Sequence, residues 1–263
     1  MLIEISSGEN RLVIDPIFGG RVTQWFFRDL QILGSKGNHP LLGGWYLMAP
    51  WAGRIRDNKI IFRGKEFPQN INFQTFAIHG TVPFTEGKVQ NQTETSVEIV
   101  HETSDPWPIK MQILQKWIIT KNYVKSSAKI SCAEGEFPAE LGWHPWFNRQ
   151  LARGEKARFG IEAVSQYVKD ENQFTLSETK SIGIPPFDDA FHVPTGKGFI
   201  EWPQALRLDI TSDVDTFIVY DELQDLFCIE PQTGPPDAVN HPKHLVDPQN
   251  PLEASVKWEL ISL

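Results

Sequence analysis

Short runs of alternating or β-branched apolar residues recur along almost the whole chain. Alternation places successive side chains on opposite faces of a strand, and Gly, Pro and Asn, which favour turns, separate the runs. Helical periodicity is nearly absent. The pattern predicts strands at Leu2–Ser6, Arg11–Ile14, Val22–Phe27, Lys59–Phe62, Val97–His101, Met111–Ile119, Tyr123–Cys132, Arg158–Ala163, Ser165–Lys169, Phe199–Trp202, Leu206–Ile210, Thr216–Tyr220, Leu226–Glu230 and Ser255–Leu263.

The chain of 263 residues shows no internal repeat, no low-complexity tract and no linker-like change of composition. We therefore expect one all-β domain over residues 1–263, built as a large sandwich or barrel. Two polar segments carry weaker signals. Asp57-Asn58 is typical of a hairpin turn before the strand at Lys59–Phe62, and Glu171–Lys180 is compatible with a loop or a short helix.

Composition narrows the classes of partner and location. The net charge of −8 and the pI of about 5.4 argue against a nucleic-acid or anionic-membrane partner, which would need a basic face. The two cysteines, Cys132 and Cys228, form neither a disulfide framework nor a zinc-binding spacing. With no signal-peptide pattern and no apolar run long enough for a membrane span, we expect a soluble cytoplasmic protein.

The stretch LGWHPWFN, residues 141–148, is the hardest to explain as packing alone. His144 lies between Trp143 and Trp146, and Pro145 restricts its backbone. Because Pro145 has no N–H, this segment is not expected inside a central strand. Histidine can donate and accept a proton near neutral pH, and aromatic faces can hold the apolar face of a sugar. A half-buried histidine in an aromatic corner of the core is the alternative.

Four further polar residues stand at predicted strand ends or after a rigid segment. Arg54 precedes a predicted hairpin, His79 precedes the turn-forming Gly80, and Asp188 follows a rigid Pro-Pro-Phe segment. Glu230 closes an apolar strand, where partial desolvation raises a carboxyl pKa toward the range useful for proton transfer. Taken singly, each of these residues is as compatible with a surface charge, a packed side chain or a turn as with a functional site.

Together and in this order, the segments PWAGRI, AIHG, GWHPWFN, FDDAF and CIEPQTGPPDAVN resemble the aldose 1-epimerase (galactose mutarotase) family. The resemblance extends from about Asn10 to the C-terminus, and the segment around Glu230 is its most specific part. It implies a β-supersandwich with little helix and a groove across one sheet. Two positions depart from the family pattern: Gly53 stands where Asn is common, and Gln232 where an aromatic residue is frequent.

The resemblance implies that His144 is the general acid and Glu230 the general base. It also implies sugar contacts from Arg54, His79 and Asp188, with Asp189 as the alternative to Asp188. Any of three tryptophans could stack on the sugar: Trp51, Trp143 or Trp146. The expected substrate is a small sugar such as glucose, galactose or a related aldose, and the expected assembly is a monomer or homodimer.

Anomer interconversion opens and closes the ring bond between C1 and O5. It requires one proton removed from the C1 hydroxyl and one delivered to O5, so no metal or cofactor is expected. Glu230 is expected as a carboxylate and His144 as an imidazolium, facing each other across a gap as wide as one pyranose. Deprotonation of Glu230 and protonation of His144 would then set a bell-shaped pH profile.

Other functions remain open at this point. A hexose-6-phosphate 1-epimerase would need further cations, for which Arg56, Lys59 and Arg63 are available. A non-catalytic carbohydrate-binding protein would use the same aromatic and polar residues. A glycosidase would need two carboxylates, such as Glu230 with Asp188 or Asp189. The pair His241 and His244 is a weak candidate for zinc, because no thiolate lies nearby in the sequence.

Overall fold

The computed structural model describes all residues, 1–263, and consists almost entirely of antiparallel strands. The strands of the first large sheet are β1 (Ile3–Ser7), β2 (Asn10–Asp15), β3 (Arg21–Phe27), β4 (Leu30–Gln31), β5 (Trp45–Met48), β13 (Gly142–Asn148), β15 (Ser165–Lys169), β16 (Thr175–Lys180), β17 (Asp188–His192), β20 (Thr216–Tyr220) and β21 (Leu226–Gln232). Their spatial order is β1-β2-β3-β5-β13-β21-β20-β17-β15-β16, and β4 pairs with β3.

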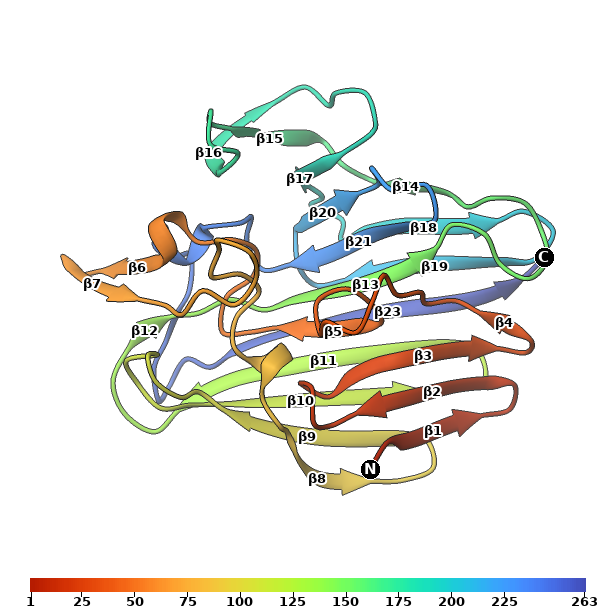
Figure 1. The fold of residues 1–263 in the computed structure, drawn as a ribbon, viewed down its shortest axis with the longest axis horizontal. Helices are drawn as coiled ribbons and strands as arrows, with labels where there is room; N and C mark the ends of the chain where they lie inside the picture. The colour runs from red at the N-terminus through yellow and green to blue at the C-terminus, as the bar shows by residue number, and fades with distance from the viewer.

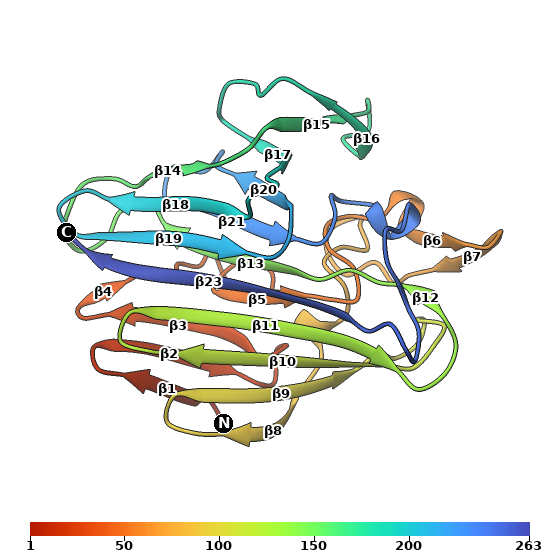
Figure 2. The ribbon, with the colours of Figure 1, turned by 180° about the vertical axis from the view of Figure 1, so that it is seen from behind.

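A second large sheet lies behind the first (Figure 1 and Figure 2). Its strands are β8 (Lys88–Gln92), β9 (Ser96–Glu102), β10 (Met111–Ile119), β11 (Tyr123–Cys132), β14 (Arg158–Ile161), β18 (Lys197–Trp202), β19 (Leu206–Ser212) and β23 (Leu252–Ser262). Their order is β14-β18-β19-β23-β11-β10-β9-β8. The expected all-β supersandwich is therefore confirmed: two open sheets pack face to face, as sandwich sheets do.

The remaining elements are small. Two short pairs stand outside the large sheets, β6 (Lys59–Phe62) with β7 (Lys65–Pro68) and β12 (Phe137–Pro138) with β22 (Leu245–Val246). The only helical segments are 3-10 turns, namely η1 (Arg56–Asn58), η2 (Val82–Phe84) and η3 (Ala238–Asn240). None of these has the length or hydropathy that crossing a bilayer would require.

Tryptophans fill the space between the two large sheets. The ring of Trp45 on β5 packs edge-on against Trp117 on β10, with centroids 4.6 Å apart, and against Trp258 on β23 at 5.8 Å. Trp143 on β13 donates a buried hydrogen bond of 2.8 Å from Nε1 to Ser126 Oγ on β11. These contacts join strands of both sheets, so the tryptophans act mainly as core.

All fourteen strands predicted from the sequence coincide with strands of the structure, but three other predictions were wrong. Gly142–Asn148 is a central strand, between β5 and β21. Thr175–Lys180, expected to be loop or helix, is the edge strand β16. Asp57-Asn58 belongs to the 3-10 turn η1 and closes no hairpin, whereas the turn at Arg63-Gly64-Lys65, also expected from the sequence, joins β6 to β7.

The face of the first sheet that points away from the tryptophan core carries a second, smaller apolar cluster. Its seven buried members are Leu41, Tyr46, Met48, Ala52, Trp146, Leu226 and Cys228. Partly buried side chains from loops pack against it, among them Leu42, Phe73, Ile78 and Phe84. Consequently β13 and β21 are buried on both faces, which explains why they read as continuous apolar runs.

Candidate active site

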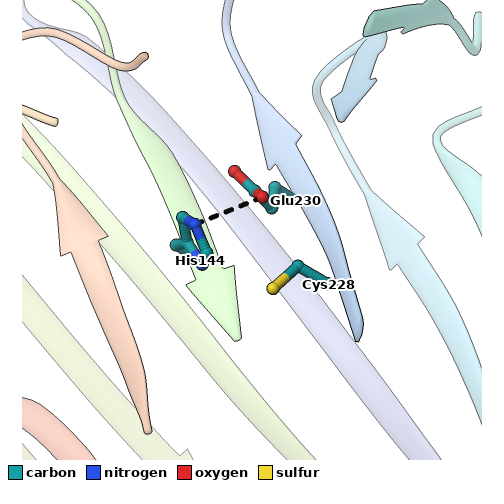
Figure 3. A group of neighbouring side chains, drawn as sticks. All are labelled: His144, Cys228 and Glu230. Atoms are coloured by element: carbon teal, nitrogen blue, oxygen red, sulfur yellow. Dashed lines mark ion pairs between the residues drawn. The ribbon is translucent and has the colours of Figure 1, made fainter. Parts of the chain in front are cut away.

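His144 and Glu230 lie next to each other on neighbouring strands of the first sheet. The register pairs Gly142 with Gln232 and Trp146 with Cys228, which places His144 directly opposite Glu230. His144 Nε2 is 3.3 Å from Glu230 Oε1, and the two side chains are 8% and 5% exposed (Figure 3). A gap as wide as a pyranose was expected from the sequence, whereas the two groups are in contact.

Two prolines leave the ladder open beside this pair. Between the paired ends Gly142–Gln232 and Trp146–Cys228, no residues of β13 and β21 pair, and Pro145 and Pro231 both lie in this interval. Neither proline has an N–H to donate. The prediction that Pro145 excludes a central strand failed for this reason, because the proline is tolerated where the two strands exchange no hydrogen bonds.

Burial acts against a charge on either member of the pair. Desolvation, with a further contribution from the charge of Asp188, raises the pKa of Glu230 well above its ordinary value. Desolvation lowers the pKa of His144 to about 3. Since the two groups touch, they titrate as one unit, and both shifts favour its uncharged form, a protonated carboxyl beside a neutral imidazole. The expected resting state of carboxylate and imidazolium is therefore not the favoured one.

Aromatic rings hold the imidazole of His144 from two sides. Tyr46, its cross-strand partner on β5, stacks on it with ring centroids 4.7 Å apart, and Trp146 stacks at 5.2 Å. The Trp146 indole also donates a hydrogen bond to Leu41 O. Of the three tryptophans considered for sugar stacking, only Trp146 lines the cleft, since Trp51 and Trp143 belong to the main core.

Gln232 is a neighbour of the pair that the sequence analysis noted only as a departure from the family pattern. Its amide donates a hydrogen bond of 3.2 Å from Nε2 to Glu230 Oε2. The spacing of two residues along a strand puts Gln232 and Glu230 on the same face, so the alternation alone could have identified it. Gly142 makes this position possible, because a Cβ there would lie 3.0 Å from Gln232 Cγ.

His79 reaches the site from a strained turn. Its φ is +60° and that of Gly80 is +77°, and a Cβ on Gly80 would lie 2.0 Å from Ala49 O. The Gly53 amide donates to His79 Nδ1 at 3.3 Å, so the ring proton is assigned to Nε2. Burial, with the nearby His144 and Arg54, lowers the pKa of His79 well below 6.5. His79 is therefore a neutral donor, 5.1 Å from the His144 ring between centroids.

Arg54 and Asp188 form an ion pair at the cleft, with Arg54 Nη2 3.5 Å from Asp188 Oδ2. Asp188 begins β17 and lines the cleft, whereas Asp189 does not and pairs with Lys169 at 3.3 Å. The geometry favours Asp188 over Asp189 as the candidate sugar ligand. The strand β17, which orients both side chains, was not recognised in the sequence.

The six residues predicted from the sequence line one cleft of about 430 Å³. They are Arg54, His79, His144, Trp146, Asp188 and Glu230. Further lining side chains, which the sequence analysis did not propose as site residues, include Lys36, Phe76, Tyr220 and Glu222. These residues come from loops and strand ends without a local sequence signal. The volume suits a single small molecule.

Two buried carboxyl groups hold the loop that carries Arg54. Glu140 Oε2 accepts a hydrogen bond from the Ala52 amide at 3.3 Å, and Asp237 Oδ1 accepts one from the Arg56 amide at 2.9 Å. Gly53 between them has a φ of +72°, and a Cβ there would lie 2.7 Å from Pro236. The departure from the family's asparagine at this position thus has a steric reason in this chain.

The statistical model of the family described as aldose 1-epimerase matches residues 1–257. The chain belongs to the aldose 1-epimerase family. Membership over this length supports an epimerase-type activity on sugars, and it agrees with the resemblance seen in the motifs.

Individual aldose 1-epimerase relatives are distant in sequence and close in fold. The uncharacterized protein YphB of Escherichia coli (strain K12) is 20% identical over 258 residues, which is 88% of each chain. A galactose mutarotase-like protein from Clostridium acetobutylicum superposes with a TM-score of 0.84 at 16% identity, covering 100% of this chain and 95% of the other. A GalM/aldose epimerase homologue from C. elegans gives 0.83 at 15% identity, covering 100% and 99%.

The Glu140 anchor predicts a pH-dependent stability. Burial raises the pKa of Glu140 to about 8, against 4.5 for a free glutamate. Across this window the folded protein keeps a proton that the unfolded chain releases, so wild-type stability falls as pH rises. Glu140→Gln removes the titration. The stability of this variant relative to wild type should increase between pH 5 and pH 8, on the order of 4 kcal/mol.

Urea unfolding at several pH values measures this difference. Glu134→Gln, at an exposed position nearby, is the matched control and should run parallel to wild type. Parallel curves for Glu140→Gln and wild type would contradict the assignment of a buried, protonated Glu140.

Proposed function

We propose that this protein is an aldose 1-epimerase that interconverts the α and β anomers of free hexoses. The observation that carries the proposal is the contact of 3.3 Å between His144 Nε2 and Glu230 Oε1 in a cleft of single-sugar size. The two oxygens that exchange protons in anomer interconversion, O1 and O5, are bonded to the same carbon. An acid and a base side by side can therefore address both oxygens.

The proton count of the pair fits this reaction. Glu230 accepts the proton of the C1 hydroxyl while His144 gives a proton to O5, so the pair holds one proton before and after ring opening. The reactive form, with Glu230 ionised and His144 protonated, differs from the favoured resting form by one proton shift between the two groups. Burial disfavours this charged form, and ring opening returns the pair to its uncharged state. Rotation about C1–C2 and closure complete the interconversion.

The neighbouring residues supply the remaining contacts. The neutral His79 donates from Nε2, and the Arg54 guanidinium provides a cation at the same edge of the cleft; both suit oxygen acceptors on the sugar. Asp188 accepts hydrogen bonds from sugar hydroxyls, and Trp146 offers apolar surface beside the imidazole. No step requires a metal or cofactor.

A phosphorylated substrate is less compatible with the charges of the cleft. Arg56 pairs with Asp170 at 2.8 Å, Lys59 pairs with Glu66 at 2.8 Å, and Arg63 pairs with Glu136. None of these three cations lines the cleft. Within the cleft Arg54 is already paired with Asp188, which leaves Lys36 as the one cation without an ion-pair partner, and the carboxyl group of Glu222 lines the same cleft.

A protein that only binds sugar would gain nothing from the buried pair. Holding a titratable acid against a base at this depth costs desolvation free energy, and hydroxyl recognition can use exposed polar groups instead. The glycosidase alternative is weakened because Asp189, one of its possible carboxylates, is paired with Lys169 outside the cleft.

Substitution of either member of the pair should abolish catalysis. Because each proton-transfer group contributes about 10²–10⁴-fold, we expect Glu230→Gln and His144→Asn each to lower kcat by that factor. Polarimetry of freshly dissolved α-glucose or α-galactose measures the rate. Asp189→Asn is the matched control and should stay within about threefold of wild type, because its side chain lies outside the cleft. Retention of the wild-type rate by both pair variants would refute the mechanism.

The pH profile should be a broad plateau. Activity requires one proton on the pair, so it falls when His144 gains a second proton, with a pKa of about 3, and when Glu230 loses the shared one, with a pKa well above 4.5. This assigns the acid limb to His144 and the alkaline limb to Glu230, the reverse of the expectation from sequence. The measurement is kcat/KM against pH after subtraction of spontaneous mutarotation. An acid limb at the ordinary histidine value of about 6.5 would contradict it.

Free and phosphorylated sugars separate the two epimerase functions. The cleft offers a phosphate group only one cation outside an ion pair, Lys36, so kcat/KM for glucose should exceed that for glucose 6-phosphate by about tenfold or more. A higher kcat/KM for the phosphorylated sugar would assign the protein to the hexose-6-phosphate class.

A further inference from the structure

Cys228 is a buried nucleophilic group that the proposed reaction does not use. It lies on β21 two residues before Glu230, so both side chains point to the same face of the strand. Its cross-strand partner on β13 is Trp146. The thiol is fully buried beneath the catalytic pair and does not line the cleft. A role in sugar contact is thereby excluded.

The three side chains nevertheless present a metal ligand set. One imidazole nitrogen of His144, the thiol sulfur of Cys228 and a carboxylate oxygen of Glu230 all lie within 4.8 Å of one another (Figure 3). Tetrahedral zinc with Zn–N of about 2.0–2.1 Å, Zn–O of about 2.0–2.2 Å and Zn–S of about 2.3 Å keeps its ligand atoms roughly 3.3–3.6 Å apart. The His144–Glu230 distance of 3.3 Å already meets this requirement.

We propose that His144, Cys228 and Glu230 bind Zn²⁺ as an inhibitory ion that competes with the sugar. The donor set of nitrogen, sulfur and oxygen atoms is one that zinc uses in proteins. On binding, the Cys228 thiol and the pair each release a proton to solvent, and the metal bonds to the thiolate, the imidazole and the carboxylate. A fourth coordination position remains for water.

Inhibition follows from which atoms the ion occupies. His144 Nε2 and Glu230 Oε1 are the atoms that the proposed reaction needs for proton transfer, so an ion bonded to both removes acid and base together. This consequence rests on the proposed function, whereas the metal site itself rests only on the geometry of the three side chains. The two claims are therefore tested by separate measurements.

The binding test uses the purified full-length chain and the metal alone. Co²⁺ reports a thiolate ligand by its sulfur-to-metal charge-transfer absorption, and titration calorimetry gives the affinity and stoichiometry for Zn²⁺. We expect one Zn²⁺ per chain, with a Co²⁺ thiolate band. Cys228→Ser should abolish the band and weaken Zn²⁺ binding by about tenfold or more, since the softest of three ligands is lost. Cys228→Ala, which removes the sulfur without burying a hydroxyl, is the second variant.

Cys132→Ser is the matched control. Cys132 is the other free cysteine, only partly buried on β11 and away from the cleft, so this variant should bind Zn²⁺ and Co²⁺ as wild type does. Equal affinity and an unchanged Co²⁺ band in wild type and both Cys228 variants would overturn the proposal. Loss of the signal in Cys132→Ser alone would overturn it equally.

The inhibition test adds Zn²⁺ to the polarimetric assay. Wild type and Cys132→Ser should lose activity, with the loss reversed by EDTA and relieved by higher sugar concentration. Measured against its own metal-free rate, each Cys228 variant should need about tenfold more Zn²⁺ for the same fractional loss. Metal binding without any mutarotase activity would refute the proposed function and leave the zinc site standing. Mutarotase activity that Zn²⁺ inhibits equally in all variants would refute the zinc site alone.

Discussion

The contact between His144 and Glu230 depends on a register of strands that leaves both side chains on the same face of the sheet. Along a strand the side-chain period is two, so a slip of one residue between β13 and β21 would turn one member of the pair into the tryptophan core. The flanking pairs Gly142–Gln232 and Trp146–Cys228 hold this register on either side of the open interval. The opening at Pro145 and Pro231 is therefore bounded by regular pairing, and the acid and base meet at a defined place.

The tryptophan core gives that register its energetic basis. Trp143 and Phe147 on β13 point into the space between the sheets, and Trp45 on β5 packs there against Trp117 and Trp258. Buried aromatic side chains of this size contribute strongly to stability, so the alternation of β13 is specified by its inward residues. His144 and Trp146 then point to the other face by necessity. The position of the site is thus a consequence of core packing.

Loops on that other face convert the exposed side of a sheet into a cleft. The turn at His79-Gly80 approaches Ala49 so closely that no Cβ fits at residue 80, and Glu140 with Asp237 holds the loop around Gly53 by its amides. Within the cleft the side chains of His144 and Glu230 are almost fully removed from solvent, and this burial sets the electrostatics. Desolvation moves the pKa of Glu230 up and that of His144 down, so the same burial that creates the site also keeps it uncharged at rest.

The alternating pattern was sufficient for the fold class and for all fourteen strands it predicted, because period-two burial is a local property of the chain. The order of the motifs along the chain was sufficient to recognise the family and to predict six residues that line the cleft. Nine strands escaped recognition, among them β5, β13, β16 and β17 of the sheet that carries the site. Segments β5 and β13 are buried on both faces and lose the alternation, while β16 and β17 are short and polar and gain their strand geometry by pairing with neighbours.

Only the tertiary structure decided the distance between His144 and Glu230, the pKa shifts of the two groups and the residues that surround them. No local pattern encodes that His144 and Glu230, 86 positions apart (230 minus 144), touch at 3.3 Å, or that Cys228 lies beneath them. The pKa values of both groups are shifted for the same reason, since a pKa depends on the solvent removed by residues distant in sequence. The sequence determined which chemical groups are present and on which face of a strand each one lies. Packing determined how close these groups lie and how far they are removed from solvent.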